Sequence, residues 1–121
     1  MLDKRLLIVT GKGGVGKTTV AGALGLVAAR AGRRTIVAEV ARRTDVAGAF
    51  GTATGSSQER ELAPGLFHIS IDPQDALEEY LRDQLPGPLA EALAASRAFT
   101  LLAAATPGLR ELLTVGKLWE L

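Results

Sequence analysis

Apolar and polar positions follow one another in blocks that predict alternating strands and helices. Short apolar runs of the kind that form buried strands occupy residues 6–9, 35–40 and 66–71. A stretch of small and apolar residues from 16 to about 30 predicts the first long helix, and Gly32 supplies a C-terminal stop. A strand, a helix and a second strand in this order predict a parallel sheet with a right-handed crossover.

The pattern becomes polar between the second and third apolar runs. Arg42, Arg43 and Thr44 form a loop, and Asp45 is a plausible cap for a short helix that runs through Phe50. Residues 51–57 are rich in Gly, Ser and Thr, which is typical of a mobile loop.

The remainder of the sequence predicts helices. Asp72 followed by Pro73 indicates a helix start, because aspartate caps the first turn and proline fits the first helical position. Residues 86–88, Pro-Gly-Pro, end that helix. Residues 89–105 predict the next helix, and Thr106 with the following proline caps a last helix that runs to the terminus.

A glycine-rich loop lies between the first apolar run and the first helix. It fits the pattern G-x-x-x-x-G-K-[ST] and consists of Gly11, Lys12, Gly13, Gly14, Val15, Gly16, Lys17, Thr18 and Thr19. Glycines let successive backbone N–H groups turn inward on an anion, and the helix N-terminus adds partial positive charge. Lys17 would reach the terminal phosphates, and the Thr18 hydroxyl would ligate Mg²⁺. The loop therefore predicts a nucleoside triphosphate site.

The same loop also satisfies G-x-G-x-x-G, the pattern of dinucleotide-binding domains. That interpretation needs an acid near the end of the second strand to hold a ribose, and Glu39 is close to that position. It leaves Lys17 and Thr18 unexplained, because a pyrophosphate cradled by backbone needs neither a lysine nor a metal-binding hydroxyl. We favour the triphosphate and keep a dinucleotide-binding Rossmann domain as the alternative.

Lys12 adds a second lysine to the loop, which then resembles the K-G-G-x-G-K-T-T pattern of the deviant Walker A ATPases. Residues 71–81 are similar to the I-D-P-x-x-A-L-x-x-Y segment of the arsenite-pump and tail-anchored-protein-targeting ATPases. Residues 106–113 resemble the P-G-x-x-E helix of that family. The resemblance extends along most of the chain, although residues 115–120 match no motif of the family. The D-x-D-P-Q segment of partitioning-type relatives is missing after the second strand.

The resemblance implies an α/β fold: a P-loop NTPase-like parallel sheet with flanking helices, and a helical segment at the C-terminal end. We expect residues 1–121 to be the N-terminal part of a single ATPase domain in a truncated chain. In this division, residues 1–85 are the nucleotide-binding core and residues 86–121 the helical segment.

For the site, the resemblance implies that residues 11–19 bind ATP, that Thr18 ligates Mg²⁺, and that Lys12 and Lys17 are catalytic. In this class the early lysine reaches the nucleotide of a partner subunit, so a homodimer around ATP is implied. Hydrolysis would drive transport or targeting of a client, either an anion or metalloid or a hydrophobic protein segment. In the targeting branch, the helices after residue 88 would form an apolar groove that Phe99, Leu101, Leu102 and Leu113 could line.

The sequence departs from the family at the switch that follows the second strand. The family has an S-T-D-P-A-H-like segment whose aspartate positions the attacking water, and here Ala41 occupies that place. Glu39 or Asp45 could substitute for it. A non-hydrolysing, nucleotide-dependent interaction module therefore stays open as an alternative function.

Composition limits the remaining possibilities. A chain of 121 residues with 47% hydrophobic residues is at most one ordinary globular domain. The net charge of +1 gives no reason to expect nucleic acid as a partner. The absence of cysteine excludes disulfides and thiolate metal sites, and no apolar run is long enough to span a bilayer, so we expect a soluble cytoplasmic protein. His68, the only histidine, alternates within a strand and has no ligand partners, so it is predicted to be a packed or half-exposed strand residue.

Overall fold

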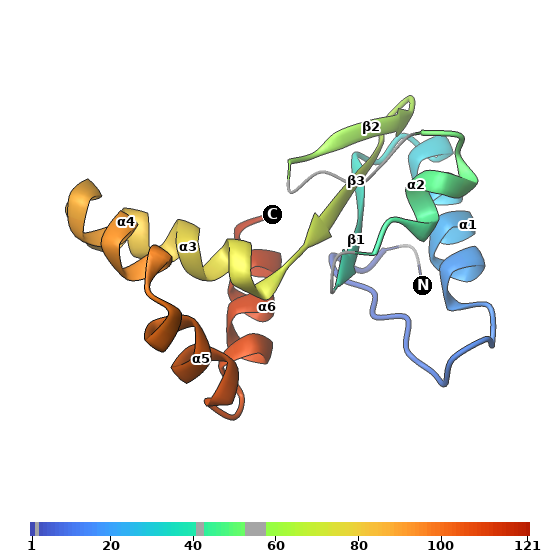
Figure 1. The fold of residues 1–121 in the computed structure, drawn as a ribbon. Coiled ribbons are helices and arrows are strands. Elements are labelled where there is room, and N and C mark those ends of the chain that lie inside the picture. The colour runs from blue at the N-terminus through green and yellow to red at the C-terminus, as the bar shows by residue number, and fades with distance from the viewer. Residues whose placement is uncertain (2, 41–42, 53–57) are drawn as a thin grey trace. The chain divides into compact units, whose positions relative to one another are not determined.

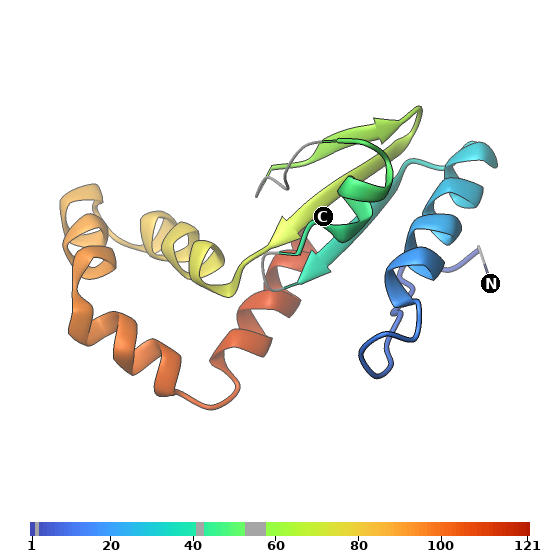
Figure 2. The ribbon, with the colours of Figure 1, turned by 45° about the vertical axis from the view of Figure 1, so that its right-hand side comes forward.

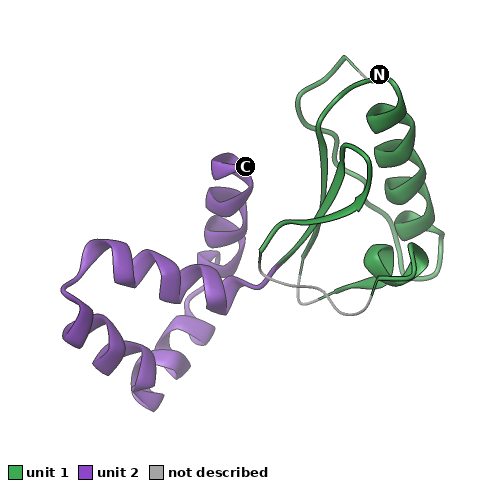
Figure 3. Ribbon diagram, turned by 90° about the horizontal axis from the view of Figure 1, so that it is seen from above, with its two compact units in different colours: residues 1–70 green, residues 71–121 purple. Residues whose placement is uncertain are grey.

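The computed structural model describes residues 1, 3–40, 43–52 and 58–121. The chain forms two compact units, which Figure 3 shows in different colours. The sheet unit comprises Met1–Ser70, and the helical unit comprises Ile71–Leu121. Each unit is described separately below.

The sheet unit combines a small sheet with two helices. The elements, in chain order, are α1 (Lys17–Arg30), β1 (Thr35–Val40), α2 (Asp45–Ala49), β2 (Arg60–Ala63) and β3 (Leu66–Ile71). The strand order is β1-β3-β2. The arrows of β1 and β3 point the same way in Figure 2, whereas β2 pairs antiparallel to β3. The α/β class is confirmed, but the sheet is mixed rather than parallel throughout.

The strand predicted at residues 6–9 is wrong. These residues lie outside the described sheet, and Leu6 and Ile8 are 62% and 80% exposed. A strand is stabilised by hydrogen bonds to a neighbouring strand, and the described strands pair only with one another. The predicted strand–helix–strand unit through α1 is therefore not formed in the described residues.

The other two predicted strands are confirmed as β1 and β3, but β2 was not predicted. Its sequence, Arg-Glu-Leu-Ala, is too short and polar to show strand periodicity. Pairing creates it: Arg60 lies opposite His68, and Glu61 lies opposite Phe67. The turn between β2 and β3 contains Gly65 with φ 75°, a backbone conformation that glycine adopts at little cost.

Close packing holds α1 against the sheet. A Cβ atom at Gly25 would lie 2.7 Å from Cγ2 of Val37 and 3.0 Å from Cδ1 of Leu66, so only a glycine permits this approach. The buried core of the unit also includes Ala29 and Val46. The predicted bounds of α1 are confirmed to within one residue. This contact fixes the helix whose N-terminus follows the glycine-rich loop.

The helical unit contains α3 (Pro73–Gln84), α4 (Gly87–Ala95), α5 (Arg97–Ala105) and α6 (Leu109–Glu120), which are labelled in Figure 1. The predicted start of α3 is confirmed, because Oδ1 of Asp72 accepts a hydrogen bond of 2.8 Å from the Gln74 amide. The predicted end of this helix is confirmed, but the break is shorter than the expected residues 86–88: α3 ends at Gln84, and Gly87 is already the first residue of α4. None of the helices in the described parts of the chain is long and apolar enough to cross a bilayer.

Several predicted helix boundaries were wrong. The helix expected over residues 89–105 is divided at Ser96, whose hydroxyl accepts a hydrogen bond of 3.4 Å from the Phe99 amide and caps α5. The last helix begins after Gly108, while the Thr106 hydroxyl donates to the Leu102 carbonyl at 2.8 Å. In α2 the cap position belongs to Thr44, with Asp45 as the first helical residue. The loop predicted at residues 51–57 lies largely outside the described residues.

Candidate functional site

The glycine-rich loop leads directly into α1. Gly14 and Gly16 have φ of 76° and 87°, in the left-handed region that an L side chain rarely adopts. Gly16 is the N-cap residue of α1, and the first intrahelical bond runs from the Val20 amide to the Gly16 carbonyl at 3.0 Å. The glycines thus give the loop a backbone path that ends at a helix N-terminus.

The first turn of α1 is suited to an anion. The first amides of any helix have no intrahelical acceptor, and a glycine cap has no side chain to satisfy them. In α1 these amides belong to Lys17, Thr18 and Thr19, and the helix dipole adds partial positive charge at the same place. A phosphate group therefore fits the donors present here.

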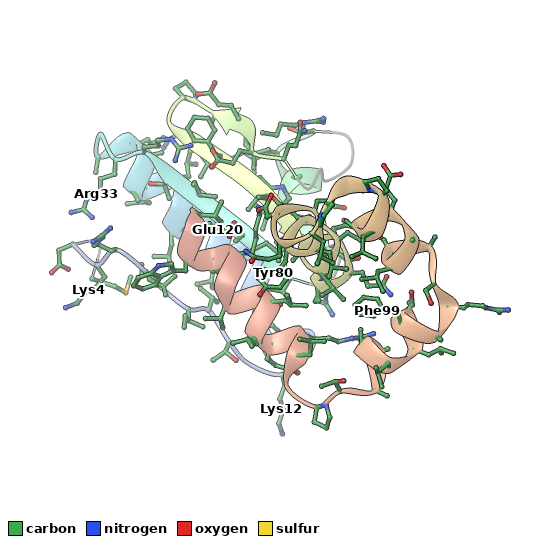
Figure 4. The ribbon with its side chains drawn as sticks, turned by 90° about the vertical axis from the view of Figure 1, so that its left-hand side faces the viewer. Lys4, Lys12, Arg33, Tyr80, Phe99 and Glu120 are labelled. Atoms are coloured by element: carbon green, nitrogen blue, oxygen red, sulfur yellow. The ribbon has the colours of Figure 1, made fainter. Side chains whose placement is uncertain are left out.

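The side chains of the two loop lysines point in different directions. Nζ of Lys17 donates a hydrogen bond of 2.7 Å to the carbonyl oxygen of Lys12, so this side chain folds back onto the loop. An ammonium has three donors, and this bond uses one of them. The Lys12 side chain is exposed and points away from the loop ribbon in Figure 4. The structure therefore brings together the Lys17 ammonium and the Lys12 backbone, and leaves the Lys12 ammonium extended.

Glu39 and His68 form a buried pair that the sequence did not reveal. Oε2 of Glu39 accepts a hydrogen bond of 2.8 Å from Nε2 of His68 and one of 3.0 Å from the Val46 amide. The side chains of Glu39 and His68 are only 10% and 2% exposed. His68 is packed, as predicted, but its partner was missed. The sole available signal was that the two residues belong to strands that could be neighbours.

The hydrogen bond to His68 affects both roles that the sequence left open for Glu39, as the acid that holds a ribose and as a substitute for the switch aspartate. A buried carboxylate oxygen that already accepts two hydrogen bonds is poorly placed to hold a ribose, so the dinucleotide alternative loses its acid. Ala41, at the expected switch position, lies outside the described residues. Asp45, the other acid considered there, is the exposed first residue of α2.

The helical unit contains an apolar cavity of about 140 Å³ between α3, α4, α5 and α6. Its lining includes Leu77, Leu81, Phe99, Leu109 and Leu113. Of the four residues expected to line an apolar groove, Phe99 and Leu113 line this cavity. Leu101 and Leu102 are instead 68% and 67% exposed.

An ion pair joins the first and last helices of this unit. Nζ of Lys117 lies 2.7 Å and 2.8 Å from the two carboxylate oxygens of Glu79, and 3.3 Å from Oε2 of Glu120. The hydrogen bonds that Lys117 donates to Glu79 raise the pKa of Lys117, although partial burial opposes the shift.

Comparison with known proteins finds relatives that are named ATPases. ATPase BagA from Mycobacterium tuberculosis is 36% identical over 123 residues, which is 96% of this chain and 36% of BagA. An arsenical pump-driving ATPase from Acidiphilium multivorum is 37% identical over 75 residues, which is 61% of this chain and 13% of that protein. The chain thus spans a minor part of the length of these relatives. No solved structure matches. The sequence model of the anion-transporting ATPases matches residues 4–120, which confirms the resemblance, and the chain belongs to the anion-transporting ATPase family.

Proposed function

We propose that residues 11–19 bind ATP with Mg²⁺ and that the protein hydrolyses ATP. The observation that carries this proposal is the Lys17 ammonium, which lies 2.7 Å from a loop carbonyl at the head of a helix with uncapped amides. Membership in a family of ATPases supports the choice of nucleotide.

Each residue of the loop has a role that follows from its chemistry. The loop and first-turn amides hold phosphate oxygens, and the Lys17 ammonium exchanges its carbonyl partner for the terminal phosphates. The Thr18 hydroxyl holds Mg²⁺, which would neutralise charge that develops on the phosphates during transfer. Gly11, Gly13 and Val15 shape the loop around the anion.

Lys12 would act on a second subunit. Its side chain is exposed, so it is available to a nucleotide that its own loop does not hold. We therefore propose a homodimer that encloses ATP, in which Lys12 of each subunit contacts the phosphates bound by the other. Lys12 and Lys17 would then be the catalytic residues.

The wider role is coupling of ATP turnover to a client. We propose that residues 1–121 form the N-terminal part of one ATPase domain, with residues 1–85 as its nucleotide-binding core and 86–121 as a helical segment. An anion or metalloid is one candidate client, since the relatives include an arsenical pump-driving ATPase. A hydrophobic protein segment is the other, because an apolar cavity lies among the helices of residues 71–121.

A second candidate function is nucleotide-dependent interaction without turnover. The sequence favours it through Ala41, which replaces the expected water-positioning aspartate. The buried hydrogen bonds of Glu39 also remove one substitute for that aspartate.

Binding and turnover of Mg-ATP by the wild-type protein and by Lys17→Ala separate these functions. We expect both activities in the wild type, and weaker binding with loss of turnover in Lys17→Ala but not in Lys4→Ala, a matched change at an exposed lysine outside the loop. Binding without turnover would favour the interaction module. Binding of NAD instead of ATP would restore the dinucleotide interpretation.

A further inference from the structure

Glu39 connects three elements of the sheet unit through one oxygen atom. The residue is second to last in β1, and its Oε2 accepts hydrogen bonds from His68 of β3 and from Val46 of α2. A carboxylate oxygen accepts hydrogen bonds, so we assign to His68 the tautomer with its proton on Nε2. Charge-assisted bonds of this kind compensate for the burial of the carboxylate.

The bond to Val46 replaces a local helix cap. Thr44, the N-cap residue of α2, makes no side-chain capping bond within the described structure. Val46 is the second residue of α2, so its amide is one that the helix itself cannot satisfy. The distant carboxylate of Glu39 satisfies it, at 3.0 Å, while the Val46 side chain is 1% exposed in the core. The side chain of Glu39, near the end of β1, thereby holds the backbone at the start of α2.

This attachment lies toward the proposed nucleotide site. In Figures 1 and 2, the C-terminal end of β1 and the N-terminal end of α1 are at the same end of the sheet unit. Ligands of open α/β sheets bind beyond the carboxyl ends of the strands. The carboxylate that holds the start of α2 therefore belongs to the end of β1 at which the nucleotide is expected.

We propose that Glu39 is a positioning residue for ATP hydrolysis, which together with His68 holds the start of α2 in place and itself takes no proton from water. This inference rests on the proposed function. It assigns to Glu39 a role different from that of the missing switch aspartate, because its Oε2 accepts from two donors of the protein and its side chain is only 10% exposed.

Steady-state hydrolysis by Glu39→Gln and Glu39→Ala tests the proposal. Glutamine keeps a carbonyl that accepts from Val46 and His68 but cannot serve as a base. We expect Glu39→Gln to retain kcat within about threefold, and Glu39→Ala to lose about 10-fold or more in kcat at nearly unchanged KM, as for other supporting residues. If glutamine lost about 100-fold, as removal of a general base does, Glu39 would be catalytic and the proposal would be overturned. Wild-type kcat in Glu39→Ala would overturn it as well.

Amide exchange at Val46 gives a readout that does not depend on turnover. Protection of this amide should persist in Glu39→Gln and fall in Glu39→Ala; equal protection in all three proteins would overturn the attachment.

If circular dichroism shows that Glu39→Ala does not fold, the variants His68→Gln and His68→Leu replace it in the hydrolysis test. Glutamine keeps a donor for Glu39 and should preserve kcat, whereas leucine removes the donor and should lower kcat; equal kcat in these two variants would overturn the role of His68. If the wild-type protein has no ATPase activity, the proposed hydrolysis is wrong. Exchange of the Val46 amide would then still show whether Glu39 attaches α2 to β1.

Discussion

The ammonium of Lys17 donates to the carbonyl oxygen of Lys12 at 2.7 Å, so the side chain of one loop lysine is held by the backbone of the other. The bond places positive charge over a loop of glycines at the start of α1. A phosphate would offer this ammonium a charged partner in place of a neutral one, and hydrogen bonds to charged groups are the stronger kind. Lys17 and Lys12 therefore have different expected roles at the phosphates, and a separate variant tests each role.

Lys17→Ala should weaken binding of Mg-ATP by about 30-fold, which corresponds to about 2 kcal/mol for a lost hydrogen bond to a charged group. The measurement is isothermal titration with Mg-ATP. Lys4→Ala should bind as the wild type does, because Lys4 is exposed and outside the loop. An unchanged dissociation constant in Lys17→Ala would remove this residue from the phosphate site.

Lys12→Ala should abolish hydrolysis while keeping ATP affinity, since the Lys12 side chain extends away from its own loop. The protein should also form a dimer when Mg-ATP is saturating, which light scattering measures directly. A monomer under those conditions would contradict the proposed action across subunits, as would full activity of the variant.

Gly25→Ala should destabilise the sheet unit by about 1–3 kcal/mol, the usual cost of forcing an extra methyl group into a packed core. The added Cβ would lie 2.7 Å from Val37 and 3.0 Å from Leu66. Unfolding in urea, followed by circular dichroism, measures the change. Gly48→Ala in α2 is the matched control, because a Cβ there would meet no atom within 4 Å apart from its chain neighbours and the backbone of its own helix. Equal stability of the two variants would show that α1 does not pack as described.

The ion pair between Lys117 and Glu79 predicts a pH dependence at alkaline pH. The pKa of Lys117 is raised in the folded state, so the pair stabilises the helical unit fully below the unfolded lysine pKa of about 10.4. This stabilisation is lost as pH rises from there through the folded value. The melting temperature of the wild type should therefore approach that of Glu79→Gln across this range, whereas a constant difference would argue against the pair. Glu78→Gln, which alters an exposed pair with Arg82, should behave as the wild type.

Local signals explain why much of the fold was predictable. The bounds of α1 follow from a run of small residues and a glycine stop, and α3 starts where Asp72 and Pro73 satisfy the first turn. The division between α4 and α5 was missed although Ser96 is a good cap, because the apolar pattern continues on both sides of it. These features depend on residues within a few positions of one another.

The sequence by itself determined the loop of residues 11–19, the family and the chemistry expected of Lys17 and Thr18, since a motif of adjacent residues carries that information. The sequence also indicated β1 and β3, but tertiary structure alone decided which segments pair as strands and brought the buried pair together. Residues 6–9 have strand composition but pair with no strand in the described part of the chain, whereas β2 has little strand composition and pairs with β3. Glu39 and His68 are 29 positions apart and meet because β1 and β3 are neighbours. Strand pairing joins residues distant in sequence, so no local pattern can specify it.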